Sequence, residues 1–145
     1  DVAVTGVQTC ALPISYTRAM EPARLYDAVG GMPFFERLVD RFYAGVAADD
    51  VLLPMYPEPR DLSGARHRLT LFLAQYWGGP TTYSEERGHP RLRMRHAPFP
   101  IGSLARDRWL YHMRAAVEAC APQDDVREAL LTYFDMAAES MRTLD

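Results

Sequence analysis

The sequence predicts an all-α protein that folds as one domain, and three observations support this prediction. Apolar residues recur at helical spacing over several long stretches. No stretch shows the alternation of polar and apolar residues that is typical of a β-strand. Paired glycines and clustered prolines separate the helical stretches. The 145 residues, 48% of them hydrophobic, can bury one sizeable core and leave no room for a second.

Two helices are expected in the first third of the chain. The first covers Glu21 to Val29 and stops at Gly30-Gly31. The second starts at Pro33, a residue that the first turn of a helix tolerates, and ends near Ala48. Its apolar positions follow helical spacing: Phe34, Phe35, Leu38, Val39, Phe42, Tyr43 and Val46. This second helix should therefore bury one broad face.

A loop and a third helix follow. Three prolines between Leu53 and Arg60 favour a loop there. Asp61 can cap the third helix. Gly78-Gly79-Pro80 should end it sharply. One face of this helix is formed by Ala65, Leu69, Phe72 and Tyr76.

The stretch from Thr81 to Gly102 is predicted to be mostly irregular, because it contains several glycines and prolines and shows no clean amphipathic period. An irregular stretch of this length inside a compact domain usually carries a function or holds a ligand. It includes two of the four histidines, His89 and His96. It also includes four arginines: Arg87, Arg91, Arg93 and Arg95.

Two further helices are expected after this stretch. Ser103 can cap the first and Asp124 the second. The apolar positions of the first are Leu104, Trp109, Met113, Ala116 and Val117, and those of the second are Val126, Leu130, Phe134, Ala137 and Met141. The prediction is thus a set of about five helices around one core, with an irregular insert in the middle.

The composition excludes several classes of function. A net charge of -3 does not provide the basic surface that a nucleic-acid-binding protein needs. No apolar run approaches the roughly 20 residues of a membrane-spanning helix, so no integral membrane segment is expected. Cys10 and Cys120 form neither a disulfide framework nor a metal-binding pattern, which favours two unpaired thiols in a cytoplasmic protein.

The first residues do not fit the pattern of the rest. Val4 to Ile14 read VTGVQTCALPI, which resembles the translation of a sequencing adapter. A signal peptide is the alternative, but no basic segment precedes the short apolar stretch. We therefore expect residues 1–19 to be a non-native or disordered segment and residues 20–145 to form the domain.

Large apolar helix faces interrupted by a segment rich in histidine and arginine could surround a flat, apolar cofactor with a negatively charged edge. Haem meets this description, because an imidazole ligates its iron, apolar walls hold the macrocycle and arginines pair with its propionates. The alternative is a helical interaction module without a cofactor, which would be colourless.

Six runs of the sequence are specific enough to be compared with a known family. They are LYDAVGG (Leu25 to Gly31), RFYAGVAAD (Arg41 to Asp49), MYPE (Met55 to Glu58), FLAQYWGGP (Phe72 to Pro80), TYSEERGHPRLRMRHAPFPI (Thr82 to Ile101) and RDRWL (Arg106 to Leu110). These runs resemble the group II truncated haemoglobins of the bacterial-like globin family, over nearly the whole chain from Leu25 onward. The resemblance implies a two-over-two helical sandwich, a shortened globin, around haem b (iron protoporphyrin IX).

The resemblance implies that His96 is the proximal ligand of the iron. From the residues alone, a surface histidine in a basic loop is the alternative. His67, His89 and His112 do not match the ligand position. We expect His67 to be exposed and His89 to make a structural hydrogen bond.

Three residues match the family's distal hydrogen-bond donors: Tyr43, Tyr56 and Trp109. For Tyr43 the alternative is a core tyrosine bonded to backbone. The loop from Tyr56 to Asp61 carries Pro59 and is one residue longer than the family pattern, which leaves the position of Tyr56 open. Ala65 stands where other globins have the distal histidine, and a methyl group cannot ligate iron.

The cavity walls are also implied by the resemblance. The distal wall would be formed by Leu69, Phe72 and Tyr76, and the face around His96 by Leu92, Met94, Phe99 and Ile101. Arg68 matches the partner of a haem propionate, and Arg93 and Tyr83 are further candidates.

The function implied is reversible binding of dioxygen, carbon monoxide, nitric oxide or similar small ligands, with high oxygen affinity through the Tyr/Tyr/Trp donors. The alternative is a haem enzyme for nitric oxide dioxygenation or peroxide turnover, which would need a separate reductase. The sequence leaves the physiological role and the oligomeric state open, a homodimer included.

Overall fold

The computed structural model describes residues 22–144, and within them the chain forms helices and no strand, which confirms the all-α prediction. The elements are α2 (Pro22–Ala28), α3 (Met32–Ala47), the short 3-10 helix η1 (Leu53–Met55), α4 (Ser63–Tyr76), α5 (Thr82–Arg87), α6 (Leu92–His96), α7 (Ser103–Cys120) and α8 (Asp124–Ser140). None of these helices is both long and apolar enough to cross a membrane. The prediction for residues 1–19, including Cys10, lies outside the described residues.

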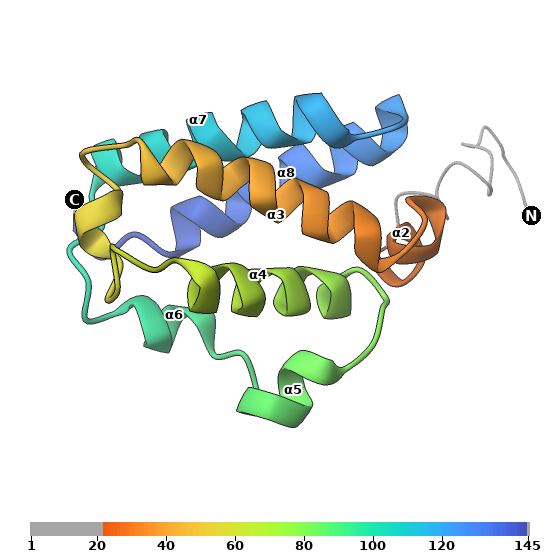
Figure 1. The fold of residues 1–145 in the computed structure, drawn as a ribbon, viewed down its shortest axis with the longest axis horizontal. Coiled ribbons are helices and arrows are strands. Elements are labelled where there is room, and N and C mark those ends of the chain that lie inside the picture. The colour runs from red at the N-terminus through yellow and green to blue at the C-terminus, as the bar shows by residue number, and fades with distance from the viewer. Residues whose placement is uncertain (1–21, 145) are drawn as a thin grey trace, which may run out of the picture.

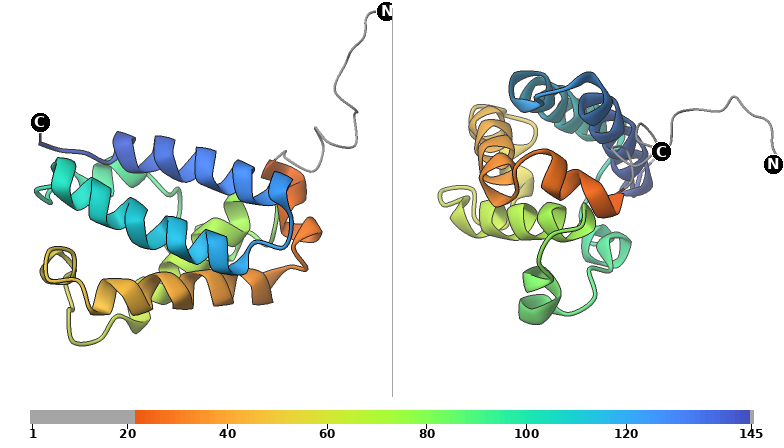
Figure 2. Two further views of the ribbon diagram at one scale, coloured as in Figure 1. Left: turned by 90° about the horizontal axis from the view of Figure 1, so that it is seen from above. Right: turned by 90° about the vertical axis from the view of Figure 1, so that its right-hand side faces the viewer.

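Four long helices form the frame of the molecule (Figure 1). α3 packs against α4 on one side and against α7 on the other, and α7 packs against α8. Figure 2 shows the short helices α5 and α6 on the side of α4 that faces away from α3. The chain from α4 to α7 therefore bends outward through α5 and α6 before it returns to the long helices.

The core is formed chiefly by α3. All seven apolar residues predicted for its inner face are buried, and Phe34, Phe35 and Phe42 are at most 1% exposed. Burying one such side chain contributes about 1.5–3 kcal/mol, so this face alone accounts for a large part of the stability. It meets Met113, Ala116 and Val117 of α7 and Leu130 and Phe134 of α8 in one cluster.

Gly78 permits the tight chain reversal after α4, as the glycine pairs predicted. Its φ angle is 103°, a left-handed conformation that side chains rarely adopt. A Cβ atom there would lie only 2.4 Å from the carbonyl oxygen of Ala23. Glycine is therefore required for α2 to cross the end of α4, where the N–H of Tyr26 donates to the carbonyl of Trp77 at 2.9 Å.

The expectation of a mostly irregular segment from Thr81 to Gly102 was wrong in part, because it contains α5 and α6. Helices of five or six residues are too short to show an amphipathic period, so tertiary contacts must define them. α5 is held to α4 by two hydrogen bonds between Ser84 and the Gln75 amide, of 2.8 and 3.0 Å.

The three predicted helix caps were each wrong by one residue. Ser103 and Asp124 are the first residues of α7 and α8, and neither helix has a side-chain cap. Asp61 lies two residues before the start of α4, where its carboxylate accepts the N–H of Ser63 at 3.0 Å. The cap residues themselves are Gly102, Gln123 and Leu62, and none of them makes a side-chain hydrogen bond at its helix end.

Candidate functional site

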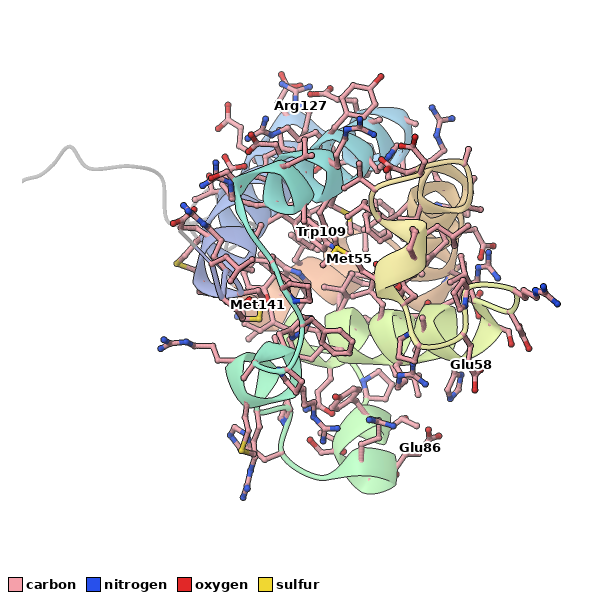
Figure 3. All side chains as sticks on the ribbon, turned by 90° about the vertical axis from the view of Figure 1, so that its left-hand side faces the viewer. Met55, Glu58, Glu86, Trp109, Arg127 and Met141 are labelled. Atoms are coloured by element: carbon pink, nitrogen blue, oxygen red, sulfur yellow. The ribbon has the colours of Figure 1, made fainter. Side chains whose placement is uncertain are left out.

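The space enclosed by the bend of the chain is a cavity of about 510 Å³, a size typical of cofactor sites. Figure 3 shows Met55, Trp109 and Met141 pointing into this part of the molecule, while Glu58, Glu86 and Arg127 lie at its periphery. Most of the predicted site residues line the cavity: Tyr43, Tyr56, Ala65, Arg68, Leu69, Phe72, Tyr83, Leu92, His96, Phe99, Ile101 and Trp109.

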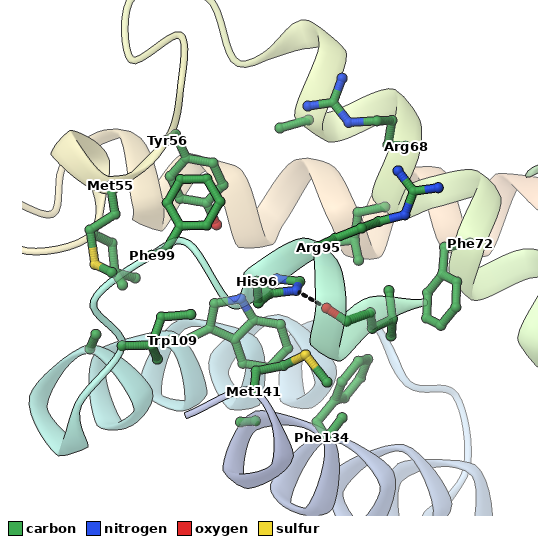
Figure 4. A pocket seen from close by; sticks show the side chains of 18 of the residues that line it. Met55, Tyr56, Arg68, Phe72, Arg95, His96, Phe99, Trp109, Phe134 and Met141 are labelled. Carbon is green, nitrogen blue, oxygen red and sulfur yellow. Dashed lines mark hydrogen bonds between the residues drawn. The ribbon is translucent and has the colours of Figure 1, made fainter. Parts of the chain in front are cut away.

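His96 is the last residue of α6, and its ring is held by its own helix (Figure 4). The ring nitrogen Nδ1 lies 2.7 Å from the carbonyl oxygen of Leu92, one turn earlier. A carbonyl oxygen only accepts, so Nδ1 must carry the hydrogen of this bond. In the neutral ring, Nε2 then has a free lone pair, which is the state in which an imidazole ligates a metal.

Tyr43 and Tyr56 form a pair at the cavity wall. Tyr43 is on α3 and is 4% exposed, and Tyr56 directly follows η1. Their ring centroids lie 5.7 Å apart in an edge-to-face arrangement. The position of Tyr56, which the longer loop had left open, is therefore beside Tyr43 at the cavity.

The hydroxyls of this pair interact with each other at the cavity wall. Burial raises the pKa of both phenols. The interaction between the two hydroxyls lowers the pKa of Tyr43 and raises that of Tyr56. Each hydroxyl has one hydrogen to donate, so one of the pair can donate to its partner while the partner donates to a guest in the cavity.

Trp109 belongs to α7 and packs between Phe42 and Phe134, with ring centroids 5.1 and 5.7 Å away. Its indole N–H can only donate. Within residues 22–144 it has no hydrogen-bond partner, so it is a second free donor at the cavity.

Four arginines contribute positive charge to the cavity wall: Arg68, Arg87, Arg95 and Arg106. Arg106 is already paired with Asp107 and Glu139. Arg95 donates to the carbonyls of Pro90 and Arg87, at 2.6 and 3.1 Å, and so fixes the turn before α6. No described carboxylate pairs with Arg68 or Arg87, which leaves both available to an anionic group.

Three of the predicted residues do not line the cavity: Tyr76, Arg93 and Met94. α6 places Leu92 and His96 on its inner face, four residues apart, and this turns Arg93 and Met94 outward. Tyr76 packs against Tyr133, which does line the cavity, with ring centroids 4.3 Å apart.

Sequence reasoning missed about half of the residues that line the cavity. These residues are Leu52, Met55, Pro57, Leu73, Arg87, Arg95, Ala105, Arg106, Tyr133, Phe134, Ala137, Ala138 and Met141. For α8 a signal existed, because Phe134, Ala137 and Met141 share the apolar face that was assigned to the core. For Arg95 nothing distinguishes it from the neighbouring arginines until its hydrogen bonds are seen.

The other histidines lie outside the cavity wall. His67 is exposed, as expected, and contacts Glu86 at 3.1 Å. His89 makes the expected structural hydrogen bond, because its Nδ1 accepts the N–H of Arg91 at 3.2 Å. No three His, Cys, Asp or Glu side chains converge among residues 22–144, so His96 faces the cavity without a second protein ligand.

Comparisons with known proteins agree on one family. A model of the bacterial-like globins matches residues 24–143. The Bacillus subtilis protein "Group 2 truncated hemoglobin YjbI" is 40% identical over 116 residues, which cover 80% of this chain and 86% of that protein.

Solved structures give the same result. A thermostable haemoglobin from the actinobacterium Thermobifida fusca is 61% identical, with a TM-score of 0.78 over 80% of this chain and 94% of that one. A truncated oxygen-avid haemoglobin from Bacillus subtilis is 38% identical, with a TM-score of 0.75 over 84% of this chain and 98% of that one.

Proposed function

Because this chain belongs to the bacterial-like globin family, as a group II truncated haemoglobin, we propose that it holds haem b in its cavity and binds dioxygen and similar diatomic gases reversibly. The observation that carries the proposal is His96, whose ring is fixed through Nδ1 while Nε2 keeps a lone pair at an apolar cavity. The iron of haem supplies reversible binding of diatomic gases.

The residues around the cavity fit this cofactor. Leu92, Phe99 and Ile101 provide an apolar surface on the side of His96, where a macrocycle would pack. Arg68 and Arg87 offer positive charge that is not already paired, which suits the two propionates of haem. Tyr83, which is 4% exposed, adds a hydroxyl at the same wall.

The donors across the cavity would set how firmly a gas is held. In the arrangement we propose, Tyr56 donates to Tyr43, so that Tyr43 donates to the guest, and Trp109 adds its N–H. Dioxygen gains partial negative charge at haem, so each such bond would slow its release. High oxygen affinity is the property proposed, in keeping with the oxygen-avid relative.

The test is the visible absorption spectrum of the purified chain, recorded with haem in the ferric state and then reduced under oxygen. A strong Soret band and a stable oxygenated form are expected. The His96→Ala variant should lose the normal ligand-field bands, while His89→Ala, in the same segment but exposed, should keep them. A wild-type chain that gives no Soret band with haem would refute the proposal. Unchanged bands in His96→Ala would refute the assignment of the ligand.

A further inference from the structure

A buried polar cluster lies outside the cavity, at the corner where α3 ends and the chain turns toward η1. Its centre is Asp49, whose side chain is only 3% exposed. The carboxylate accepts from His112 Nε2 at 2.7 Å and from Arg108 Nη1 at 3.1 Å. It also accepts the backbone N–H groups of Val51 at 2.9 Å and Leu52 at 3.1 Å. Four donors thus converge on one buried carboxylate.

A glycine in α3 leaves the space that His112 needs in this cluster. Gly45 belongs to the last turn of α3 and lies four residues before Asp49, which follows the end of the helix. A Cβ atom at Gly45 would be 2.3 Å from Nδ1 of His112, so the imidazole packs directly against the bare backbone there. The end of α3 therefore supplies the space for His112, and the corner that follows it supplies the acceptor for its N–H.

The two sides joined by Asp49 each carry residues of the cavity. Arg108 and His112 flank Trp109 on α7. The N–H groups of Val51 and Leu52 begin the segment that leads through η1 to Tyr56, and Leu52, Met55 and Tyr56 all line the cavity. One carboxylate thus ties the helix that carries Trp109 to the segment that carries Tyr56.

We propose that Asp49, His112 and Arg108 form a positioning cluster that fixes Tyr56 relative to Trp109 and thereby sets how tightly the protein holds its diatomic ligand. This inference rests on the proposed function. Asp49 Oδ1 accepts from Val51, Leu52 and Arg108, and Oδ2 accepts from His112. Asparagine keeps one acceptor oxygen, so the N–H of His112 would face an amide N–H, and the corner would have to rearrange or admit water. Either change would move Tyr56 relative to Tyr43, its neighbour at the cavity wall.

The experiment compares Asp49→Asn with Asp50→Asn in the full-length, haem-loaded chain. Asp50 is a matched control, because it is the next residue, its side chain is 92% exposed and it approaches Arg108 only at 3.7 Å. Three quantities are measured: the dioxygen dissociation rate, the C–O stretching band of the ferrous carbon monoxide form and the hydrogen exchange of residues 50–56. We expect Asp49→Asn to release dioxygen about three- to tenfold faster, to shift or split the C–O band and to exchange faster at Val51 and Leu52. Asp50→Asn should match the wild type.

Variants of His112 keep the inference testable if Asp49→Asn fails to fold. His112→Gln retains an N–H donor and should stay close to the wild type, whereas His112→Ala should behave like Asp49→Asn. Asp135→Asn, which breaks the 2.7 Å contact of Arg114 with Asp135 between α7 and α8, controls for a plain loss of stability.

Two results would overturn the inference, and they differ. If the wild type takes up no haem, the proposed function fails and the positioning role falls with it. If the wild type binds haem and dioxygen but Asp49→Asn and His112→Ala leave the rate and the C–O band unchanged, only the positioning role fails. Faster exchange in residues 50–56 would then show that the cluster merely stabilises the corner.

Discussion

Tyr43 and Tyr56 lie side by side at the cavity wall, with their rings edge to face and the ring centroids 5.7 Å apart. In the direction proposed above, Tyr56 donates to Tyr43, and only Tyr43 then retains a hydrogen for a guest. Tyr56 would act on the guest through its partner.

Substituting each tyrosine by phenylalanine should therefore have different effects. Tyr43→Phe removes the donor to the guest and should speed dioxygen release by about tenfold to hundredfold, the equivalent of about 1.5–3 kcal/mol. Tyr56→Phe leaves that donor in place and should have a clearly smaller effect. Stopped-flow measurement of dioxygen release tests this order, and equal effects would show that the direction of the bond is wrong.

Trp109→Phe should also speed dioxygen release, because phenylalanine fills much of the space of indole but has no N–H. Trp77→Phe is the matched control: Trp77 is 2% exposed, and its buried N–H has no partner and lies outside the cavity wall. The control should bind and release dioxygen as the wild type does. If both variants release dioxygen at the wild-type rate, Trp109 is not a donor to the guest.

The stability of the fold should depend on pH through Asp49. Burial raises the pKa of its carboxyl, but the hydrogen bonds from His112, Leu52, Val51 and Arg108 outweigh this and lower the pKa from 3.8 to about 2. A lowered pKa contributes stability above pH 3.8 that is lost as the pH falls through about 2. Urea titrations from pH 6 to pH 2 should show the gap in unfolding free energy between wild type and Asp49→Asn closing in this window. The difference in unfolding free energy between wild type and Asp50→Asn should stay small at every pH. If the difference between wild type and Asp49→Asn does not narrow as the pH falls, the lowered pKa of Asp49 is contradicted.

The close packing of His112 on Gly45 predicts that Gly45→Ala has opposite effects on the free energy of unfolding in two backgrounds. In the wild type, Gly45→Ala places a methyl group against His112, which is tied to Asp49, and should destabilise the fold by about 1–3 kcal/mol. In a His112→Ala background the clash is gone, and the same change should stabilise α3 by about 0.5–1 kcal/mol through helix propensity. A double-mutant cycle of unfolding free energies measures both, and additive effects would mean that the two residues do not interact.

The sequence predicted the helices that bury a regular apolar face and missed what depends on contacts between distant segments. α3 was predicted to within a residue because its pattern repeats over four turns. α5 and α6 were missed because helices of six and five residues show no amphipathic period. They are held in place by hydrogen bonds of Gln75 and Arg95 to distant or irregular parts of the chain.

The same distinction applies to the site. His96, Tyr43 and Trp109 were identified by resemblance, and their spacing alone would not have brought them together. Arg93 and Met94 were included because they neighbour His96 in sequence, yet a helix turns neighbours away from each other. Asp49 was not singled out, because an aspartate at a helix end is ordinary until its four donors are seen.

The cavity wall extends from Tyr43 on α3 to Met141 just after α8. During translation, which proceeds from the N-terminus, the site thus stays incomplete until residue 141 has left the ribosome. A nascent chain with only α3, α4 and α7 folded would present Phe72 and Trp109 to water on an unfinished surface. A cofactor that needs the whole wall would therefore bind only near the end of translation, and until then aggregation or chaperone binding could compete for the unfinished surface.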